Sequence, residues 1–318
     1  MNLTRSKKKD LLYVAVAAFF FLTACVLQTV DDYISDWSVK KTIALLTQYI
    51  FFGLLAYWTA SVISRISDKS ICSGIIVAIA LMGVILFVRL LKYHVFYEET
   101  ATRYLWYSYY IPQCIAPVVL LLTILGMGRK DGKPLAKGWY LLFLPAAALI
   151  LLVFTNDLHE QVFSFAEGLE YSNKIYKWEW GYYLILSWMV GLYLSIGVLL
   201  YVKCRISWCR KKAWIPLVLF VTCFILCVLR EVFDPSFIRM PEAVVFSVVI
   251  VFESLIRIGF IPSNVNHEGL FYLADISASI ADKNLNVVLS SKNAPEITRE
   301  QATLAANGSK TELREDLV

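Results

Sequence analysis

Residues 71 to 91 read ICSGIIVAIALMGVILFVRLL, an apolar run whose single charge, Arg89, lies near its end. A helix of roughly 20 apolar residues crosses the hydrocarbon core of a membrane, which is about 30 Å thick. Similar runs recur between residues 11 and 260, 58% of all residues are hydrophobic, and the mean hydropathy is +0.62. A water-soluble core of this size would not need so many such runs. The sequence therefore predicts a multi-pass membrane protein.

The predicted fold class is all-α, a multi-pass helical membrane bundle of seven or eight transmembrane helices followed by a short cytoplasmic α+β fragment. The eight apolar runs are expected to span Leu11–Val30, Thr42–Ser64, Ile71–Leu91, Tyr104–Met127, Gly138–Phe154, Tyr182–Val202, Trp214–Leu229 and Pro241–Phe260.

Positive charge alternates between the connecting segments and predicts the orientation. By the positive-inside rule, segments rich in Lys and Arg are cytoplasmic. This places the N-terminus and the C-terminal tail on the cytoplasmic side of the membrane. The formal net charge of +5 is therefore attributed to topology and to contact with membrane lipids, with no nucleic-acid partner. The basic segments contain Arg5, Lys7, Lys8, Lys9, Arg65, Lys69, Arg129, Lys130, Lys133, Lys137, Lys203, Arg205, Arg210, Lys211 and Lys212.

The first run has an alternative interpretation. Basic residues, an apolar stretch and then Leu22-Thr23-Ala24-Cys25 match a bacterial lipoprotein signal, in which the cysteine is lipidated after cleavage. Lipidation of Cys25 would leave seven helices and an outer N-terminus. Val26 and Leu27 continue the apolar run where such a signal normally turns polar, which favours an uncleaved first helix.

Charged residues within membrane spans are rare because they are costly, so each is a candidate for function. Nearly all of them lie at predicted outer ends: Arg89, Lys92, Arg103, Arg230, Glu231 and Glu242. After Arg103, two aromatic pairs follow at helical spacing, Tyr104 with Tyr107 and Trp106 with Tyr110. Aromatic walls with a few polar groups are typical of a small-ligand pocket.

The longest predicted outer segment, residues 155 to 181, begins with Asn156, Asp157 and His159. Its later aromatic residues are more typical of a plain belt at the membrane interface than of a ligand pocket. With three histidines in the chain and no metal-protease spacing, we expect no metal, no cofactor and no catalytic residue. The candidate ligand-binding residues are Arg103, Tyr104, Trp106, Tyr107, Tyr110, Asn156, Asp157, His159 and Arg230.

Glu253 and Arg257 lie in the inner half of the last predicted span, four residues apart. This spacing and order favour an intrahelical ion pair. The favoured interpretation is a structural pair near the cytoplasmic end of the helix. Because its helix leads into the tail, Glu253 and Arg257 are also the candidate residues for signal transmission.

Four segments of the chain resemble a known family. RYLWYSYYIP from Arg103, TNDLHEQVF from Thr155, GYY from Gly181 and GFIPSN from Gly259 look like the N-terminal seven-helix (7TM) membrane region of bacterial sensor histidine kinases. The resemblance covers roughly residues 40 to 300. It implies a sensing input region of a two-component system in the bacterial cytoplasmic membrane. It also implies a homodimer if the chain is part of a kinase, and a PAS-like linker after the last helix.

The resemblance divides the chain into three parts. Residues 1–41 hold the basic N-terminus and the first helix or lipoprotein signal, 42–262 the 7TM sensor region, and 263–318 an incomplete PAS-like cytoplasmic tail. Two short strands are expected at Ile276–Ile280 and Asn286–Ser290. The sequence to Val318 contains no phosphoacceptor segment and no nucleotide-binding glycine pattern, so this chain is not expected to be an enzyme.

The functional prediction is a transmembrane sensory input module that recognises an extracytoplasmic or membrane-borne small molecule and signals through its last helix. The alternatives are a multi-pass small-molecule transporter and a stand-alone membrane receptor. Transport would require polar groups near the bilayer midplane, where Gln48 and Gln113 are nearly the only strongly polar residues.

Overall fold

The computed structural model describes residues 2–66, 68–127, 135–165, 176–204, 207–233, 239–261, 263, 278–281 and 287–290. The chain forms two compact units, Met1–Ile261 and Pro262–Val318. The boundary lies within one residue of the predicted start of the tail.

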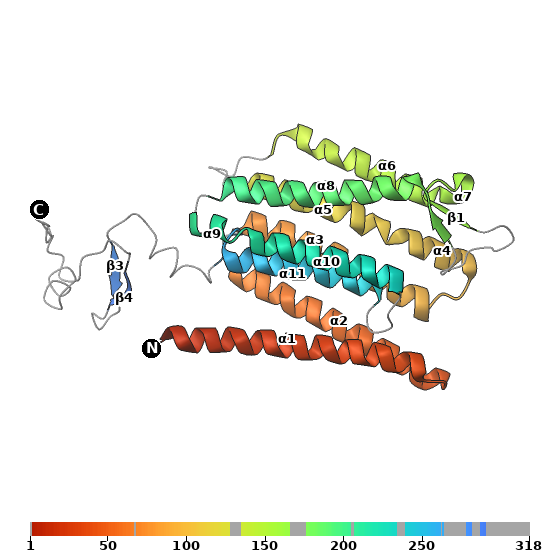
Figure 1. Cartoon of the computed structure of the whole chain (residues 1–318), viewed down its shortest axis with the longest axis horizontal. Helices are drawn as coiled ribbons and strands as arrows, with labels where there is room; N and C mark the ends of the chain where they lie inside the picture. Colours follow the sequence, from red (N-terminus) through yellow and green to blue (C-terminus); the bar gives the residue numbers. More distant parts are fainter. Residues whose placement is uncertain are drawn as a thin grey trace, which may run out of the picture. The chain divides into compact units, whose positions relative to one another are not determined.

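The first unit is a bundle of helices that run side by side (Figure 1). A 3-10 helix, η2 (Lys137–Leu142), leads directly into α6. The α-helices are α1 (Asn2–Tyr33), α2 (Trp37–Arg65), α3 (Lys69–His94), α4 (Glu99–Ser108), α5 (Tyr110–Gly126), α6 (Phe143–Phe154), α7 (Asn156–His159), α8 (Trp180–Lys203), α9 (Ser207–Lys211), α10 (Trp214–Phe233) and α11 (Met240–Ile258).

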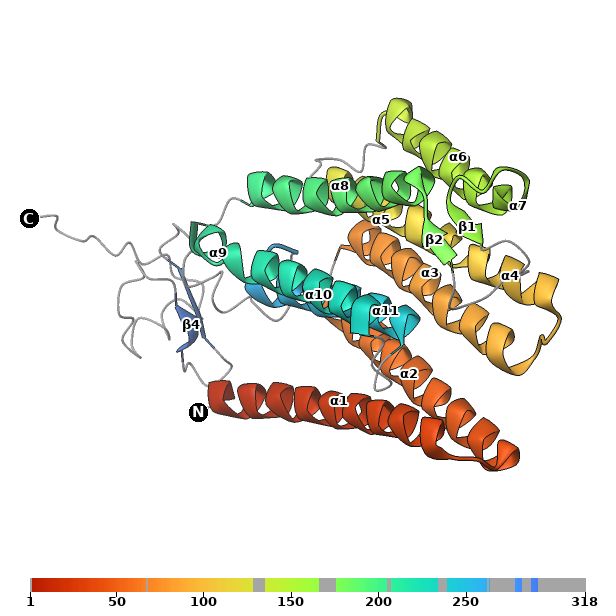
Figure 2. The same cartoon turned by 45° about the vertical axis from the view of Figure 1, so that its right-hand side comes forward.

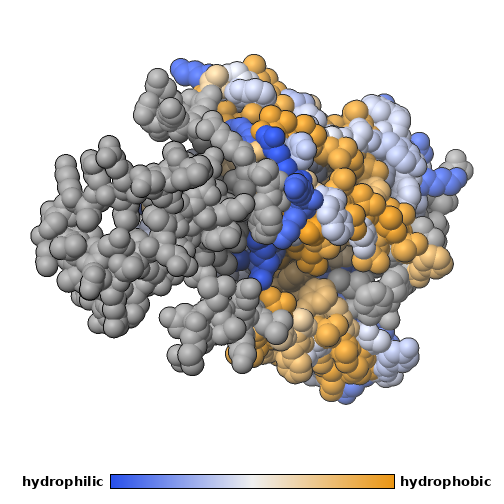
Figure 3. All heavy atoms as spheres, turned by 60° about the vertical axis from the view of Figure 1, so that its left-hand side comes forward, coloured by the Kyte–Doolittle hydropathy of each residue, from blue (hydrophilic) through white to orange (hydrophobic). Residues whose placement is uncertain are grey.

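Seven helical segments in the described part of the chain are long and apolar enough to cross a membrane, which identifies a multi-pass membrane protein by length and composition. Their outward surfaces carry many exposed Leu, Val, Ile and Phe side chains, and Figure 3 shows hydrophobic atoms over much of the described surface that faces the viewer. Such a surface suits lipid contact. The segments are Leu12–Tyr33, Trp37–Arg65, Lys69–His94, Glu99–Gly126, Lys137–Phe154, Trp180–Lys203 and Cys209–Leu229.

The eighth predicted span corresponds to α11, which differs from the other seven in its charge. It is a helix of 19 residues that carries Glu242, Glu253 and Arg257. It packs against α3 and α10. Both glutamates are ion-paired with arginines of neighbouring helices, and such pairing allows charge within a membrane protein. That α11 crosses the membrane stays a prediction.

Polar residues set several helix ends. The carboxylates of Asp36 and Asp68 accept backbone N–H bonds from the first turns of α2 and α3 and cap both helices. At the end of α5, the Lys203 ammonium donates to the carbonyls of residues 124, 125 and 127 at 2.7–2.8 Å. α11 ends at Gly259, whose φ of 95° is left-handed and favours glycine.

α3 is the central helix of this unit. It packs against α2, α4, α5 and α11, and Figure 2 shows it between α2 and α5. Its side chains include the fully buried Ile85 and Leu86. Gly74 allows a close approach to α5, because a Cβ built there would overlap the side chain of Thr123. A small residue is needed at this contact, as is common between membrane helices.

The fourth predicted span, Tyr104–Met127, is interrupted at Tyr109 between α4 and α5. Proline has no N–H to continue a helical ladder, and Pro112 lies four residues after Ser108, where α4 ends. Pro117 lies inside α5 without ending it. Tyr109 keeps helical dihedral angles, and Tyr109 and Tyr110 line the cavity described below.

Cys25 lies within an unbroken helix, since α1 continues for eight residues beyond it to Tyr33. Phe21, on the N-terminal side of Cys25, packs edge-to-face on Phe51 of α2 and Phe246 of α11. A segment that lipoprotein cleavage would remove thus contributes to the packing, which supports an uncleaved first helix.

Two short hairpins accompany the helices. In the first unit β1 (Phe163–Phe165) pairs antiparallel with β2 (Tyr176–Trp178), a hairpin that the sequence analysis did not predict. In the tail β3 (Ser279–Ala281) pairs antiparallel with β4 (Val287–Ser290). Two strands were expected in this part of the chain. The rest of the expected PAS-like fragment lies outside the described residues.

Candidate functional site

A cavity of about 520 Å³, partly open at the surface, lies between helices of the first unit. This volume falls within the range of roughly 300–1,000 Å³ that is usual for small-ligand pockets. Its wall is built by α3, the α4–α5 junction, α8, α10, α11 and strand β2. Along α11 the wall extends from Met240 to Phe252, a rise of about 18 Å at 1.5 Å per residue. The cavity is therefore elongated along the bundle.

Three cationic side chains line the cavity: Arg89, Lys92 and Arg239. They belong to the last turns of α3 and to the start of α11, which the predicted topology places at the outer end. The described wall contains no Asp or Glu. The opposite end is apolar and includes Tyr193, Phe220, Val251 and Phe252.

Arg89 is held from behind by an ion pair with Glu242 of α11, whose side chain is fully buried. Its Nη1 also donates to Gln48 Oε1 at 3.1 Å, and the Gln48 amide donates to the Leu86 carbonyl at 3.1 Å. Gln48, one of the few polar residues predicted inside a span, thus serves to orient Arg89. Removing one partner of a buried ion pair is strongly destabilising, so both Arg89 and Glu242 are expected to be needed for stability.

Arg239, the N-cap residue of α11, faces α1. Its Nη2 lies 3.4 Å from Asp31 Oδ2 and 3.3 Å from Asp32 Oδ1. These contacts tie the end of α1 to the start of α11, and Arg239 still contributes to the cavity wall.

Lys92 is buried, with 5% of its surface exposed. Its ammonium lies 5.4 Å from the centre of the Tyr93 ring and 5.9 Å from that of Trp106. Aromatic faces attract cations and hold the ammonium at the cavity wall.

The predicted candidates Arg103, Tyr107, Asn156 and Asp157 contact one another and do not line the cavity. Asp157 Oδ2 lies 3.3 Å from Arg103 Nη2, and the Tyr107 hydroxyl donates to Asp157 Oδ1 at 2.7 Å. Asn156 donates to the Tyr107 hydroxyl at 3.4 Å. This cluster joins α7 to α4.

Asn156 organises the segment that follows α7. Fully buried, it accepts the N–H groups of Val162 and Phe163 at 2.9 and 3.0 Å and donates to the Phe163 carbonyl at 2.9 Å. His159 bonds locally, with Nδ1 accepting the Gln161 N–H and Nε2 lying 3.2 Å from Thr155 Oγ1. These bonds position β1 and give both residues a structural role.

The other predicted candidates divide between the cavity and its surroundings. Trp106 and Tyr110 line the cavity, and both pack on Phe163 of β1. Tyr104 packs on Tyr107 and Phe154 and is 39% exposed. Arg230 lies in α10, with its side chain outside the described part of the chain.

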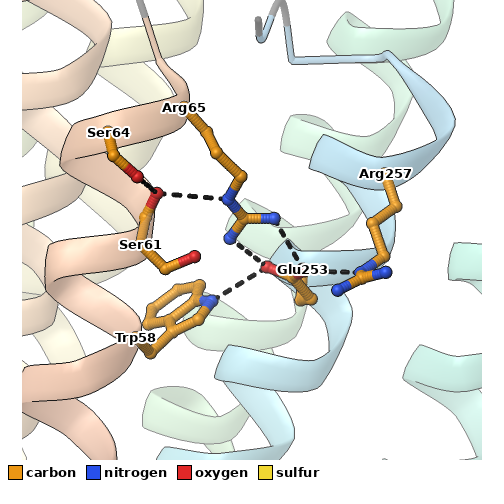
Figure 4. Close-up of polar contacts among 6 residues, drawn as sticks. All are labelled: Trp58, Ser61, Ser64, Arg65, Glu253 and Arg257. Atoms are coloured by element: carbon orange, nitrogen blue, oxygen red, sulfur yellow. Dashed lines mark hydrogen bonds and ion pairs between the residues drawn. The ribbon is translucent and has the colours of Figure 1, made fainter. Parts of the chain in front are cut away.

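Glu253 of α11 forms the predicted ion pair with Arg257, whose Nε lies 2.6 Å from Glu253 Oε1. The sequence analysis did not predict its larger set of contacts, drawn in Figure 4. Arg65 of α2 binds both oxygens of Glu253, at 2.8 and 2.7 Å, and Trp58 Nε1 donates to Oε2 at 3.0 Å. The Arg65–Glu253 ion pair therefore ties α2 to α11.

The cavity and this ion pair share one turn of α11. Val248, Val251 and Phe252 line the cavity, and Glu253 is the next residue along the helix. Any shift of α11 that accommodates a ligand at Phe252 would also move Glu253 relative to Arg65.

Sequence reasoning did not select several wall residues as binding candidates. Arg89 and Lys92 were noticeable as charges near a predicted span end. The alternation of Tyr176 and Trp178 is a strand signal that the sequence analysis did not use. No sequence pattern marked Arg239 as a binding candidate. No cluster of His, Cys, Asp and Glu suited to a metal ion occurs among the described residues.

The fold and the cavity thus define a multi-pass helical membrane protein with an internal pocket. Comparisons with family models, curated proteins and solved structures find no match to this chain.

Proposed function

We propose that this chain is the sensory input module of a two-component signalling histidine kinase. In this proposal a small molecule enters the cavity between the helices, and its binding changes the packing of α11. The family resemblance of the sequence motifs supports the kinase context. The single observation that carries the sensing role is the elongated cavity along α11, the helix that precedes the tail.

The two-state element in this proposal is the contact between α2 and α11. In one state Arg65 holds Glu253 as described above; in the other, a ligand displaces the turn of α11 around Phe252 and weakens that contact. A ligand shifts such an equilibrium only by its difference in affinity for the two states. The cavity wall on α11 supplies that difference.

The test is a membrane chimera in which the chain replaces the sensor region of a complete histidine kinase, with phosphorylation of the response regulator as the readout. Val248→Trp fills the cavity from α11 and should lock the output at a constant level. Ile250→Trp is the matched control, because Ile250 is 46% exposed on the same helix. Equal outputs from both variants and the parent, under all growth conditions, would refute the proposal.

The same variants distinguish the module from a transporter. A transporter would take up its substrate into proteoliposomes and lose that uptake in Val248→Trp. The sensor module is expected to show binding without net uptake.

A further inference from the structure

We infer that Gln113 of α5 is the polar anchor for an uncharged ligand, one that carries an amide-like group between an aromatic ring and an apolar chain. This inference rests on the sensor role proposed above and specifies its ligand class. It is carried by the balance of charge at one end of the cavity, by the aromatic wall and by the position of Gln113.

The charged end of the cavity gives no net attraction for an ion. Three cations line it, and the acids that pair with its two arginines supply three carboxylates. Glu242 pairs with Arg89, and Asp31 and Asp32 pair with Arg239. Moving an ion from water into an apolar site is costly unless an opposite charge meets it. A ligand without charge avoids this cost.

Aromatic rings from the α4–α5 junction, β2 and the start of α8 form one wall of the cavity. The rings pack on one another: Trp106 lies 5.0 Å from Tyr176, and Trp178 stacks on Tyr182 at 5.2 Å between ring centres. Contacts between aromatic rings stabilise beyond the burial of their area, so this wall suits a ligand ring. It consists of Trp106, Tyr110, Tyr176, Trp178 and Tyr182.

Gln113 brings an amide to this wall at the middle of a membrane-spanning segment. It lies 14 residues after Glu99 and 13 before Gly126, the ends of that segment. Tyr110 precedes it by about one helical turn on α5, and both residues line the cavity. A ligand ring packed on Tyr110 therefore places its neighbouring group near Gln113.

The half-buried Gln113 side chain has no hydrogen-bond partner among the residues that the structure describes. Gln48, the other strongly polar residue predicted inside a span, is bonded to Arg89 and to the Leu86 carbonyl. A polar group in an apolar interior is costly unless it is hydrogen-bonded. An amide both donates and accepts, so a ligand amide matches both ends of the Gln113 side chain.

The cavity continues past Gln113 with mainly apolar side chains. The Trp188 indole donates to the Cys114 carbonyl at 3.5 Å, which sets this part of α8 level with Gln113. The wall beyond that level includes Met189 of α8, Phe220 of α10 and Val251 of α11. An apolar chain attached to the ligand amide would lie against these side chains.

The test measures binding of radiolabelled N-phenyloctanamide to the full chain in nanodiscs of phosphatidylcholine, with empty nanodiscs as the measure of partition into lipid. Saturable binding of one molecule per chain is expected. Phenyl octanoate has the same ring and chain but an ester in place of the amide, so it lacks the N–H donor. It should bind about 3- to 10-fold more weakly, the effect of one hydrogen bond.

Gln113→Leu should bind both probes with equal affinity, because the group that distinguishes them is gone. Its binding of phenyl octanoate shows at the same time that the pocket is folded. Gln113→Met, which keeps the length of the side chain, is the second variant and should behave in the same way. Ser195→Ala is the control, because Ser195 is an exposed polar residue of α8 outside the described cavity wall, and it should keep the preference for the amide.

A further arm tests the absence of charge. 8-Phenyloctanoate, an anion with a comparable ring and chain, should displace bound N-phenyloctanamide at least about 10-fold less well than unlabelled N-phenyloctanamide does. Equal displacement would contradict an uncharged ligand. Equal binding of amide and ester by the parent, an unchanged preference in both Gln113 variants, or no saturable binding of N-phenyloctanamide would overturn the inference.

The outcomes separate the two proposals. If Val248→Trp alters kinase output but N-phenyloctanamide does not bind, the ligand class is wrong and the sensor proposal stands. If N-phenyloctanamide binds as expected but never changes kinase output, the binding site stands and the sensor proposal fails.

Discussion

Glu253 is bound by two arginines in very different surroundings. Arg65 makes two hydrogen bonds across the α2–α11 contact, and its side chain is 14% exposed. Arg257 makes one bond within its own helix, and its side chain is 46% exposed. Exposed pairs at this helical spacing contribute little because water screens them.

We therefore expect Arg65→Ala to lower the free energy of unfolding by about 1.5–3 kcal/mol, the range for hydrogen bonds to charged groups. Arg257→Ala should cost about 0.3–0.5 kcal/mol. Thermal unfolding of both variants in a neutral detergent measures the difference. Equal losses would mean that the interhelical pair contributes no more than the intrahelical one.

Asn156 lies at the centre of the α7–β1 segment. Asn156→Ala leaves two backbone N–H groups and one carbonyl without their bonds, each costing about 1–3 kcal/mol if it stays buried. The segment should open locally, and hydrogen exchange of the Val162 and Phe163 amides should accelerate. Leu158→Ala, at a side chain that is 85% exposed, is the control and should leave this exchange unchanged.

At the scale of elements, the contact between α3 and α5 depends on a missing side chain. A Cβ at Gly74 would meet Thr123 Oγ1 at 1.9 Å and Thr123 Cβ at 2.8 Å, so the helices must separate. Gly74→Ala should cost about 1–3 kcal/mol, as overpacking does.

Gly197→Ala provides the comparison for Gly74→Ala. A Cβ at Gly197 of α8 meets nothing within 4 Å, so this variant should show little change or a small gain in thermal stability. If both variants unfold at the same temperature, the close approach of α3 and α5 is not required for stability.

The helices were largely predictable because each is an apolar run bounded by polar residues. The ends of the helices were harder to predict. For example, α2 begins at Trp37 and not at Thr42, because Asp36 caps the helix on the N-terminal side of the apolar run. The β1–β2 hairpin was missed because the aromatic residues of its second strand were interpreted as an interfacial belt. The interruption at Tyr109 follows from Pro112, a purely local effect.

At the scale of the whole molecule, the candidate site was only partly predictable. Trp106 and Tyr110 line the cavity, but Arg103 and Asp157 neutralise each other beside it. Which polar residues pair and which face a cavity depends on how helices pack. Helix packing brings together residues that are far apart in the sequence. The cavity wall joins residues from Ile85 to Phe252, and the Arg65–Glu253 pair joins residues 188 positions apart.

In the proposed mechanism, the cavity and the α2–α11 contact are coupled through α11. Spin labels at Ser64 and Arg257, placed on a background without the native cysteines, report the distance between these two helices by pulsed electron spin resonance. In Val248→Trp the filled cavity should shift this distance distribution, and in Ile250→Trp it should stay as in the parent. A distribution that is the same in all three proteins would contradict the coupling.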